Sequence, residues 1–177
     1  HIDDTILKAM GRRTSEKEIK NLIEKIRNAG DVAIRSTFIV GFPGETDEQF
    51  QKLYDFIGEY KLNYAGFFAY SKEDGTAAAK LKNQIPQAVK NKRLKNITAL
   101  QSKVIFENNK NYVGKSLKVL YEGIDYDNNI FYGRPEFCAP EVDAKVLFSS
   151  DNLVNVGNFY DVKITGANGY DLVGEVK

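Results

Sequence analysis

Apolar positions near the start of the chain follow the period of an α-helix. Residues 3–10 open with two aspartates and carry Ile and Leu side chains at helical spacing as far as Gly11, which predicts a short amphipathic helix. Ser15 and Glu18 then form a capping box, and the helix that it begins ends at residues 29–30. The apolar stripe of this second helix consists of Ile19, Leu22, Ile23 and Ile26.

The same spacing predicts two further helices. Thr46 and Gln49 cap the first, whose apolar stripe consists of Phe50, Leu53, Tyr54 and Ile57. Pro86 suits the first turn of a long helix that reaches about Tyr112. The apolar face of the long helix contains Val89, Leu94, Ile97, Leu100, Val104 and Ile105. The long helix also has a run of cations, which we expect to form a solvated face rather than an RNA-binding patch: Lys90, Lys92, Arg93 and Lys95.

Two apolar runs between these helices predict strands. Residues 32–40, VAIRSTFIV, are rich in β-branched side chains and are typical of a strand buried on both faces of a parallel sheet. Residues 64–70, YAGFFAY, predict a second buried strand. Arg35 lies inside the first run, where a buried charge is costly unless it is paired. The alternation of helices and strands indicates parallel α/β units.

The pattern changes at Gly114. The segments SLKVLYEG, DAKVLFSS, YDVKITG and YDLVGEVK alternate with a period of two, and residues 168–169, Asn-Gly, are a hairpin signal between the last two. Short strands of this kind predict a small antiparallel barrel. We therefore expect two domains, residues 1–113 and 114–177.

Charge separates the same two parts. Residues 114–177 contain six Lys and Arg against ten Asp and Glu, a net charge of −4, so the rest of the chain carries +5 within a total of +1. A total near zero favours neither nucleic acid nor a membrane as the partner. Cys138 is the single cysteine, which excludes an internal disulfide and favours the cytoplasm. No apolar run reaches the length of a membrane span, the first residues do not form a signal peptide, and a chain that begins with His hints at a longer gene product.

The stretch from Arg35 to Thr46, RSTFIVGFPGET, has the residues of a binding site at the end of a strand. Ligands of α/β barrels lie at the carboxyl ends of the strands. Gly41 and Gly44 let the backbone approach a ligand closely, and Arg35 offers a planar donor for a carboxylate. Composition alone favours a plain glycine turn that joins the strand to the next helix.

The segment VAIRSTFIVGFPGETDEQF resembles the fifth barrel strand and the following turn of radical S-adenosylmethionine methylthiotransferases. The resemblance continues upstream through HIDDTILKAMGRRTSEKEI and downstream through FFAYSKEDGTAAA, and residues 114–177 resemble a TRAM domain. It implies the C-terminal βα units of a TIM-like barrel, followed by an antiparallel five-stranded, OB-like barrel. Residues 11–14, 70–76 and 133–144 are more similar to the RimO type than to the tRNA-modifying MiaB type, whose strand typically has Asp where Phe38 stands.

The resemblance implies a reaction that requires S-adenosylmethionine and two 4Fe-4S clusters. The RimO type methylthiolates the β-carbon of an aspartate in a small-subunit ribosomal protein. Each cluster is normally held by three cysteines, so a chain with Cys138 alone is expected to hold neither cluster and to be inactive by itself. Two alternatives stay open: a tRNA methylthiotransferase of the MiaB type, and a stand-alone binding module that contains a TRAM domain.

The resemblance also implies seven cofactor-binding positions and no catalytic residue or metal ligand in this chain. Ile39 and Gly41 would lie beside the adenine, and strand alternation would point Arg35 and Thr37 into the barrel. A structural ion pair is the alternative role for Arg35. The remaining positions, at the ends of neighbouring strands, are His1, Tyr70 and Ser71.

The acidic small domain predicts the partner. Binding to an RNA backbone needs clustered Lys and Arg side chains, whereas a basic ribosomal protein would be attracted by an acidic surface. We therefore expect docking of a basic ribosomal protein at Asp125, Asp127 and Asp143, with RNA less favoured and no membrane contact.

Overall fold

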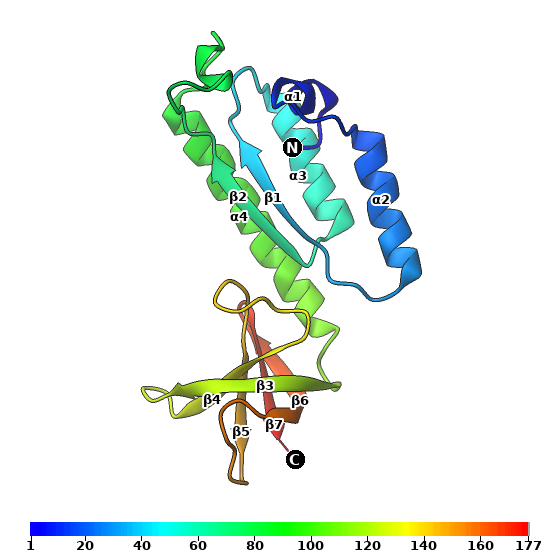
Figure 1. Ribbon diagram of the computed structural model, residues 1–177, viewed down its shortest axis with the longest axis vertical. Coiled ribbons are helices and arrows are strands. Elements are labelled where there is room, and N and C mark those ends of the chain that lie inside the picture. Colours follow the sequence, from blue (N-terminus) through cyan, green and yellow to red (C-terminus); the bar gives the residue numbers. More distant parts are fainter. Residues whose placement is uncertain (177) are drawn as a thin grey trace. The chain divides into compact units, whose positions relative to one another are not determined.

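The computed structural model describes residues 1–176 (Figure 1). Residues 1–104 and the residues from 105 onward form two compact units, and the domain boundary at 113/114 stays a prediction. The helices are α1 (Asp4–Ala9), α2 (Glu16–Ala29), α3 (Asp47–Tyr60) and α4 (Gln87–Lys110), with a 3-10 turn η1 (Ala78–Lys80). The strands of the first unit are β1 (Arg35–Val40) and β2 (Tyr64–Ala69).

β1 and β2 form a parallel two-stranded sheet, as the alternation of elements predicted. The register runs from Arg35 opposite Tyr64 to Val40 opposite Ala69. Helices pack on the face that carries Phe38 and Val40 (Figure 1). The core on this side includes Ile23 of α2, Ile97 of α4 and, from α3, Phe50, Leu53, Phe56 and Ile57.

The other face of this sheet is open, so the prediction of a strand buried on both faces was wrong. Arg35, Thr37 and Ile39 alternate with the buried residues of β1 and are exposed. In β2 the matching position is Phe68, whose side chain is 63% exposed. A continuous apolar run indicates that both faces of a strand are apolar, but it does not show which residues pack on each face.

Two predicted capping boxes determine where α2 and α3 begin. The Ser15 hydroxyl accepts from the Glu18 amide and the Glu18 carboxylate accepts from the Ser15 amide, which confirms the first capping box. Thr46 and Gln49 form the same reciprocal pair at α3. These caps satisfy amides that have no partner inside the helix.

The second unit is a closed five-stranded barrel in the order β3-β4-β5-β7-β6. Its strands are β3 (Ser116–Asp125), β4 (Ile130–Pro135), β5 (Val146–Ser150), β6 (Phe159–Asn168) and β7 (Asp171–Val176). The interior is apolar and contains Val119, Tyr121, Val146, Phe148, Val162, Ile164 and Leu172.

The barrel matches the predicted architecture but not the predicted strand directions. β6 and β7 form the hairpin signalled by Asn168 and Gly169, with Asn168 opposite Asp171. β5 and β7 run parallel, so the barrel is mixed and the expectation of a wholly antiparallel barrel was wrong. Alternation specifies the inward side of each strand, whereas the direction of β5 depends on how the long connections before and after it cross the barrel.

Candidate functional site

The turn that follows β1 is held by a carboxylate inside the protein. Gly41 has a positive φ of 70° and is buried. Its N–H donates to Oε2 of Glu45 at 2.9 Å. The Val40 carbonyl, which belongs to the same planar peptide unit, accepts from the Tyr70 N–H at 2.9 Å. The peptide that joins β1 to its turn is therefore fixed from both ends.

Glu45 is 2% exposed and is neutralised by a residue of α4. Nη1 of Arg93 donates to Oε1 of Glu45 at 2.8 Å and to the Glu45 carbonyl at 3.2 Å. Nη2 of Arg93 donates to Asp47 at 2.6 Å, and the guanidinium holds the pKa of that exposed carboxylate below its ordinary value. The pairing with Arg93 offsets the cost of removing the Glu45 charge from water.

His1 lies against the same carboxylate. Its side chain is fully buried, and Nε2 is 3.5 Å from Oε2 of Glu45. Nδ1 accepts from the N–H groups of Ile2 and Asp3, at 2.9 and 3.0 Å. Both ring nitrogens therefore face protein atoms: Nδ1 faces two backbone N–H groups and Nε2 faces the Glu45 carboxylate.

A second buried cation of α4 holds the end of β2. Nζ of Lys90 donates to the Tyr70 carbonyl at 2.9 Å. The Tyr70 ring packs edge-on against Phe42, with centroids 5.3 Å apart, in a small cluster that includes Ile6. The Tyr70 hydroxyl is buried and has no hydrogen-bond partner within residues 1–176.

Lys90 and Arg93 are 7% and 6% exposed, so the prediction that all four cations of the long helix are solvated was wrong for these two. Lys92 and Lys95 are exposed, as expected. The buried stripe of α4 is a mixture of polar and apolar residues at helical spacing: Lys90, Arg93, Ile97, Gln101 and Val104. Hydrophobicity alone missed the polar members of this stripe, whose one signal in the sequence is their helical register with Ile97.

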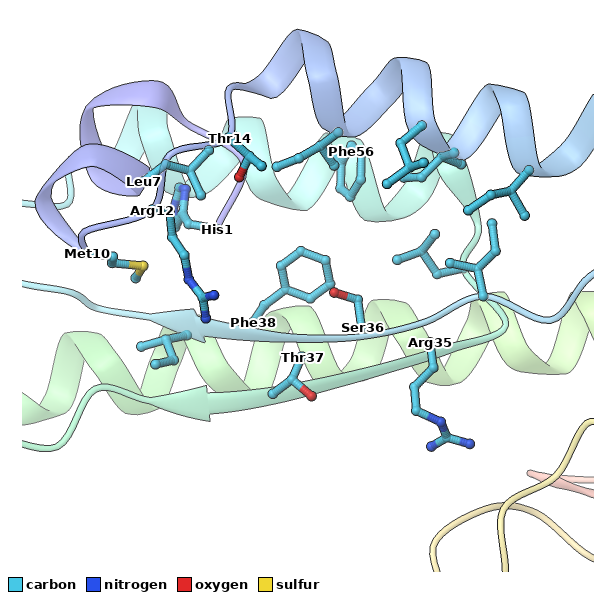
Figure 2. Close-up of a pocket in the computed structure, with 17 residues that line it drawn as sticks. His1, Leu7, Met10, Arg12, Thr14, Arg35, Ser36, Thr37, Phe38 and Phe56 are labelled. Carbon is cyan, nitrogen blue, oxygen red and sulfur yellow. The ribbon is translucent and has the colours of Figure 1, made fainter.

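Three predicted cofactor residues share the open face of the sheet. Arg35, Thr37 and Ile39 alternate along β1, and Figure 2 shows Arg35 and Thr37 pointing away from the side occupied by Ser36 and Phe38. The Arg35 guanidinium lies over the Tyr64 ring, 4.8 Å from its centroid.

A cavity of about 410 Å³ lies between α2 and β1 (Figure 2). Side chains of Ile19, Ile23 and Ile26 line the helix side of the cavity. Four of the predicted cofactor residues belong to the lining of this cavity: His1, Arg35, Thr37 and Ile39. The side chains of Arg35 and Thr37 nevertheless point to the other side of β1 (Figure 2).

The other three predicted positions lie apart from the cavity lining. Gly41 and Tyr70 are buried at the ends of the two strands. Ser71 is exposed, and its hydroxyl donates to Glu73 at 2.8 Å. The cofactor roles of all seven residues stay predictions.

Two of the three predicted docking acids meet on the barrel. Asp125 and Asp143 line a hollow of about 480 Å³, whereas Asp127 is exposed outside it. The remaining lining residues are Tyr132, Lys145, Leu147 and Asp171. Hydrogen bonds from Asn128 hold the pKa of Asp125 below its ordinary value, so this carboxylate stays charged.

Residues 1–176 contain no group of three or more His, Cys, Asp or Glu that could hold a metal ion. Cys138 is buried in the barrel unit. None of the described helices is long and apolar enough to cross a membrane.

Comparison with known proteins links both units to one family. The radical SAM superfamily matches residues 1–57, and the TRAM domain matches residues 113–176. Over 99% of its length the chain is similar to the ribosomal protein uS12 methylthiotransferases RimO of Alkaliphilus oremlandii (46% identical), Clostridium acetobutylicum (44%) and Acetivibrio thermocellus (40%).

The chain spans 41%, 39% and 39%, respectively, of the length of these three relatives. The order of the two matched regions agrees with the order of the two structural units, since the parallel sheet precedes the closed barrel. The chain therefore belongs to the radical S-adenosylmethionine methylthiotransferase family and corresponds to the C-terminal part of its RimO-type members.

Proposed function

We propose that this chain is the C-terminal part of an enzyme that methylthiolates the β-carbon of an aspartate in a small-subunit ribosomal protein. The observation that carries the proposal is the open face of β1, where Arg35, Thr37 and Ile39 lie in a row that leads into the braced Gly41 turn. The relatives named above are uS12 methylthiotransferases, which points to a ribosomal protein as the substrate class.

The residues of this face fit S-adenosylmethionine. Arg35 has a planar, permanently charged donor for the carboxylate of the cofactor. Ile39 is 37% exposed and offers an apolar surface for the adenine. Bound S-adenosylmethionine, together with its cluster, would supply the radical chemistry that removes hydrogen from an unreactive carbon.

The described residues do not fit an iron–sulfur cluster. Such clusters are held by several cysteine thiolates, and Cys138 is buried in the barrel unit. We assign no step of the reaction to a cluster in this chain. In the proposed enzyme, residues 1–104 bind and orient the cofactor, and the barrel unit recruits the substrate.

We propose that the barrel recruits a basic protein through Asp125, Asp127 and Asp143. Asp125 and Asp143 border one hollow with Asp171, and the residues from 114 onward carry a net charge of −4. The hollow has an aromatic wall at Tyr132, over which Lys145 already lies at 4.0 Å. An acidic surface of this kind speeds and orients docking of a cationic partner.

The function is tested in the full-length enzyme with its clusters assembled. We expect mass spectrometry to detect a methylthio group on an aspartate of the ribosomal protein and none on tRNA. Arg35→Met is expected to weaken S-adenosylmethionine binding about tenfold or more, the usual scale for a bidentate charged contact. Arg13→Met, at an exposed position outside the cavity lining, is the matched control. Modification of tRNA instead would assign the enzyme to the MiaB type.

The docking surface needs a separate binding experiment. Asp125→Asn combined with Asp143→Asn should weaken binding of the 177-residue chain to the ribosomal protein, most clearly at low salt. Glu136→Gln combined with Asp151→Asn changes the net charge equally at exposed positions outside the hollow. Equal losses for the two double variants would show that net charge acts without a defined site, and tighter binding to tRNA would contradict the proposed partner.

A further inference from the structure

We propose that Glu45 is a positioning residue, held by Arg93, that fixes the imidazole of His1 and the Gly41 turn at the border of the cofactor face. The inference deepens the proposed function and rests on it where S-adenosylmethionine is concerned. We call Glu45 and Arg93 the buried brace. The brace joins α4 to the end of β1 through contacts of 2.8 and 2.9 Å.

The hydrogen bonds of His1 determine its tautomer. Nδ1 accepts from two backbone N–H groups, and a nitrogen that accepts cannot carry a proton. The neutral ring must then carry its proton on Nε2, which faces Oε2 of Glu45. At 3.5 Å this contact is longer than an ordinary hydrogen bond, so Glu45 orients the ring mainly through charge.

Nε2 is buried and has no hydrogen-bond partner within residues 1–176, so the carboxylate of Glu45 is the group that it faces. An unsatisfied buried donor is costly, and a nearby carboxylate reduces that cost. Glu45 therefore favours the Nε2-protonated tautomer over the alternative, which would also break the two bonds accepted by Nδ1.

The same carboxylate oxygen controls the backbone at Gly41. Oε2 of Glu45 accepts from the Gly41 N–H, and the Val40 carbonyl of that peptide is held by Tyr70. A planar peptide fixed at both ends cannot rotate without breaking one bond. The brace thus specifies where β1 ends and in which direction the chain leaves the open face.

Arg93 holds Glu45 in place. A buried carboxylate without a partner is strongly destabilised, and Nη1 of Arg93 supplies that partner at 2.8 Å. Asp47 binds the other terminal nitrogen of Arg93, but its side chain is 90% exposed, and within residues 1–176 it forms no hydrogen bond with His1 or Gly41. Glu45 and Asp47 therefore form a matched pair: two carboxylates on one guanidinium, of which only Glu45 faces the site.

The first test needs no variant. His1 is the sole histidine of the chain, so its two ring nitrogens give the only imidazole signals in a ¹⁵N-histidine NMR spectrum. We expect a protonated Nε2 and an unprotonated Nδ1. A proton on Nδ1, or rapid exchange between tautomers in the folded chain, would overturn the inference.

The second test compares Glu45→Gln with Asp47→Asn. Glu45→Gln should shift the Gly41 amide signal, disturb the His1 tautomer and, in the cluster-loaded full-length enzyme, weaken S-adenosylmethionine binding about tenfold, the scale of loss when groups that orient a binding site are removed. Asp47→Asn should leave all three readouts unchanged. Arg93→Lys should retain part of the His1 and Gly41 signals because it keeps a cation near Glu45.

The outcomes separate the inference from the proposed function. If the unaltered enzyme does not bind S-adenosylmethionine, the proposed function fails, and the His1 tautomer alone decides the role of the brace. If the unaltered enzyme binds it and Glu45→Gln binds equally well with a shifted Gly41 signal, Glu45 is structural and the positioning role is wrong. Equal effects of Glu45→Gln and Asp47→Asn would also contradict it, because only Glu45 faces the site.

Discussion

The stem of Lys90 fills the space that a side chain at Gly41 would need. A Cβ atom at position 41 would lie 2.3 Å from Cγ of Lys90 and 3.1 Å from its Cβ. The stem cannot swing away freely, because the ammonium group is bound to the Tyr70 carbonyl. The glycine of this turn is therefore required by the packing of α4 as well as by its positive φ.

Gly41→Ala should destabilise the first unit more than Gly44→Ala. Both glycines have a positive φ, which costs a non-glycine residue about 1–2 kcal/mol. Only position 41 meets a neighbour, and overpacking adds about 1–3 kcal/mol. Chemical denaturation of the two variants measures the difference, and equal losses would show that Lys90 moves aside.

Arg93→Met should cost much more stability than Lys92→Met. Removing Arg93 leaves the buried charge of Glu45 unpaired, a loss of about 3–5 kcal/mol for such pairs. Lys92 is the next residue on α4 and is exposed, so its change should stay within about 0.5 kcal/mol. Urea unfolding followed by circular dichroism provides the comparison. A small effect of Arg93→Met would show that Arg93 is not needed to compensate the burial of Glu45.

α4 shows what could and could not be predicted from the sequence. Its length, its start near Pro86 and the burial of Ile97 followed from helical spacing. The burial of Lys90 and Arg93 did not, because a cation inside a helix face is only acceptable when a partner from elsewhere in the chain reaches it. That partner is Glu45 for Arg93 and the Tyr70 carbonyl for Lys90, and helical periodicity carries no information about either.

The strands of the barrel were also only partly predictable from the sequence. Alternation predicts most barrel strands, and Asn168-Gly169 predicts the β6–β7 hairpin, but β4 has no clear alternating pattern that would predict a strand there. In β4, Gly133 lets the backbone of β3 approach so closely that a Cβ atom there would lie 2.1 Å from the Leu120 carbonyl oxygen. The close approach of two backbones depends on how the sheet is assembled, so its one sign in the sequence is the presence of a glycine.

Acid should weaken the contact that joins α1, α2 and α3. Lys52 of α3 lies 2.6 Å from Glu16 and 3.4 Å from Asp3. The hydrogen bond with Lys52 lowers the pKa of Glu16; burial raises the pKa of Asp3, but the Ile6 amide and Lys52 outweigh it and hold that pKa below its ordinary value. Lowered carboxylate pKa values contribute stability that is complete above the ordinary carboxylate range and is lost as pH falls through the lowered values.

Lys52→Met should therefore reduce the loss of stability below about pH 4.5, where free carboxylates begin to take up protons. Thermal unfolding measured from pH 7 to pH 3 gives the slope of the melting temperature against pH. Lys25→Met, at an exposed position of α2, is the control and should leave the slope unchanged. Parallel curves for Lys52→Met and the unaltered chain would exclude this contact as a source of acid sensitivity.

Gly133→Ala should destabilise the barrel, whereas Gly166→Ala should not. A methyl group at position 133 would collide with the Leu120 carbonyl oxygen, which is backbone and cannot move independently. Position 166 on β6 has open space around it. We expect a loss of about 1–3 kcal/mol for Gly133→Ala and almost none for Gly166→Ala, measured by thermal unfolding.

The last prediction concerns the outer edge of β1 and uses hydrogen exchange. The carbonyls of Ile34 and Val40 accept from Tyr64 and Tyr70, so the even-numbered residues of β1 face β2. Successive residues of a strand direct their amides to opposite sides, and β1 has one strand neighbour within residues 1–176. The amides of Thr37 and Ile39, at odd-numbered positions inside β1, therefore point to an edge that no other described strand covers.

The amides of Thr37 and Ile39 should exchange much faster than those of Phe38 and Val40 in the 177-residue chain. Val162 and Ile164 of β6 are the internal reference, because that strand is paired on both sides by β3 and β7. Edge amides open without breaking a ladder hydrogen bond, whereas barrel amides require local or global unfolding. Uniformly strong protection of residues 35–40 in a verified monomer would show that this edge is covered, and the account of β1 as a strand with one open edge and one open face would be wrong.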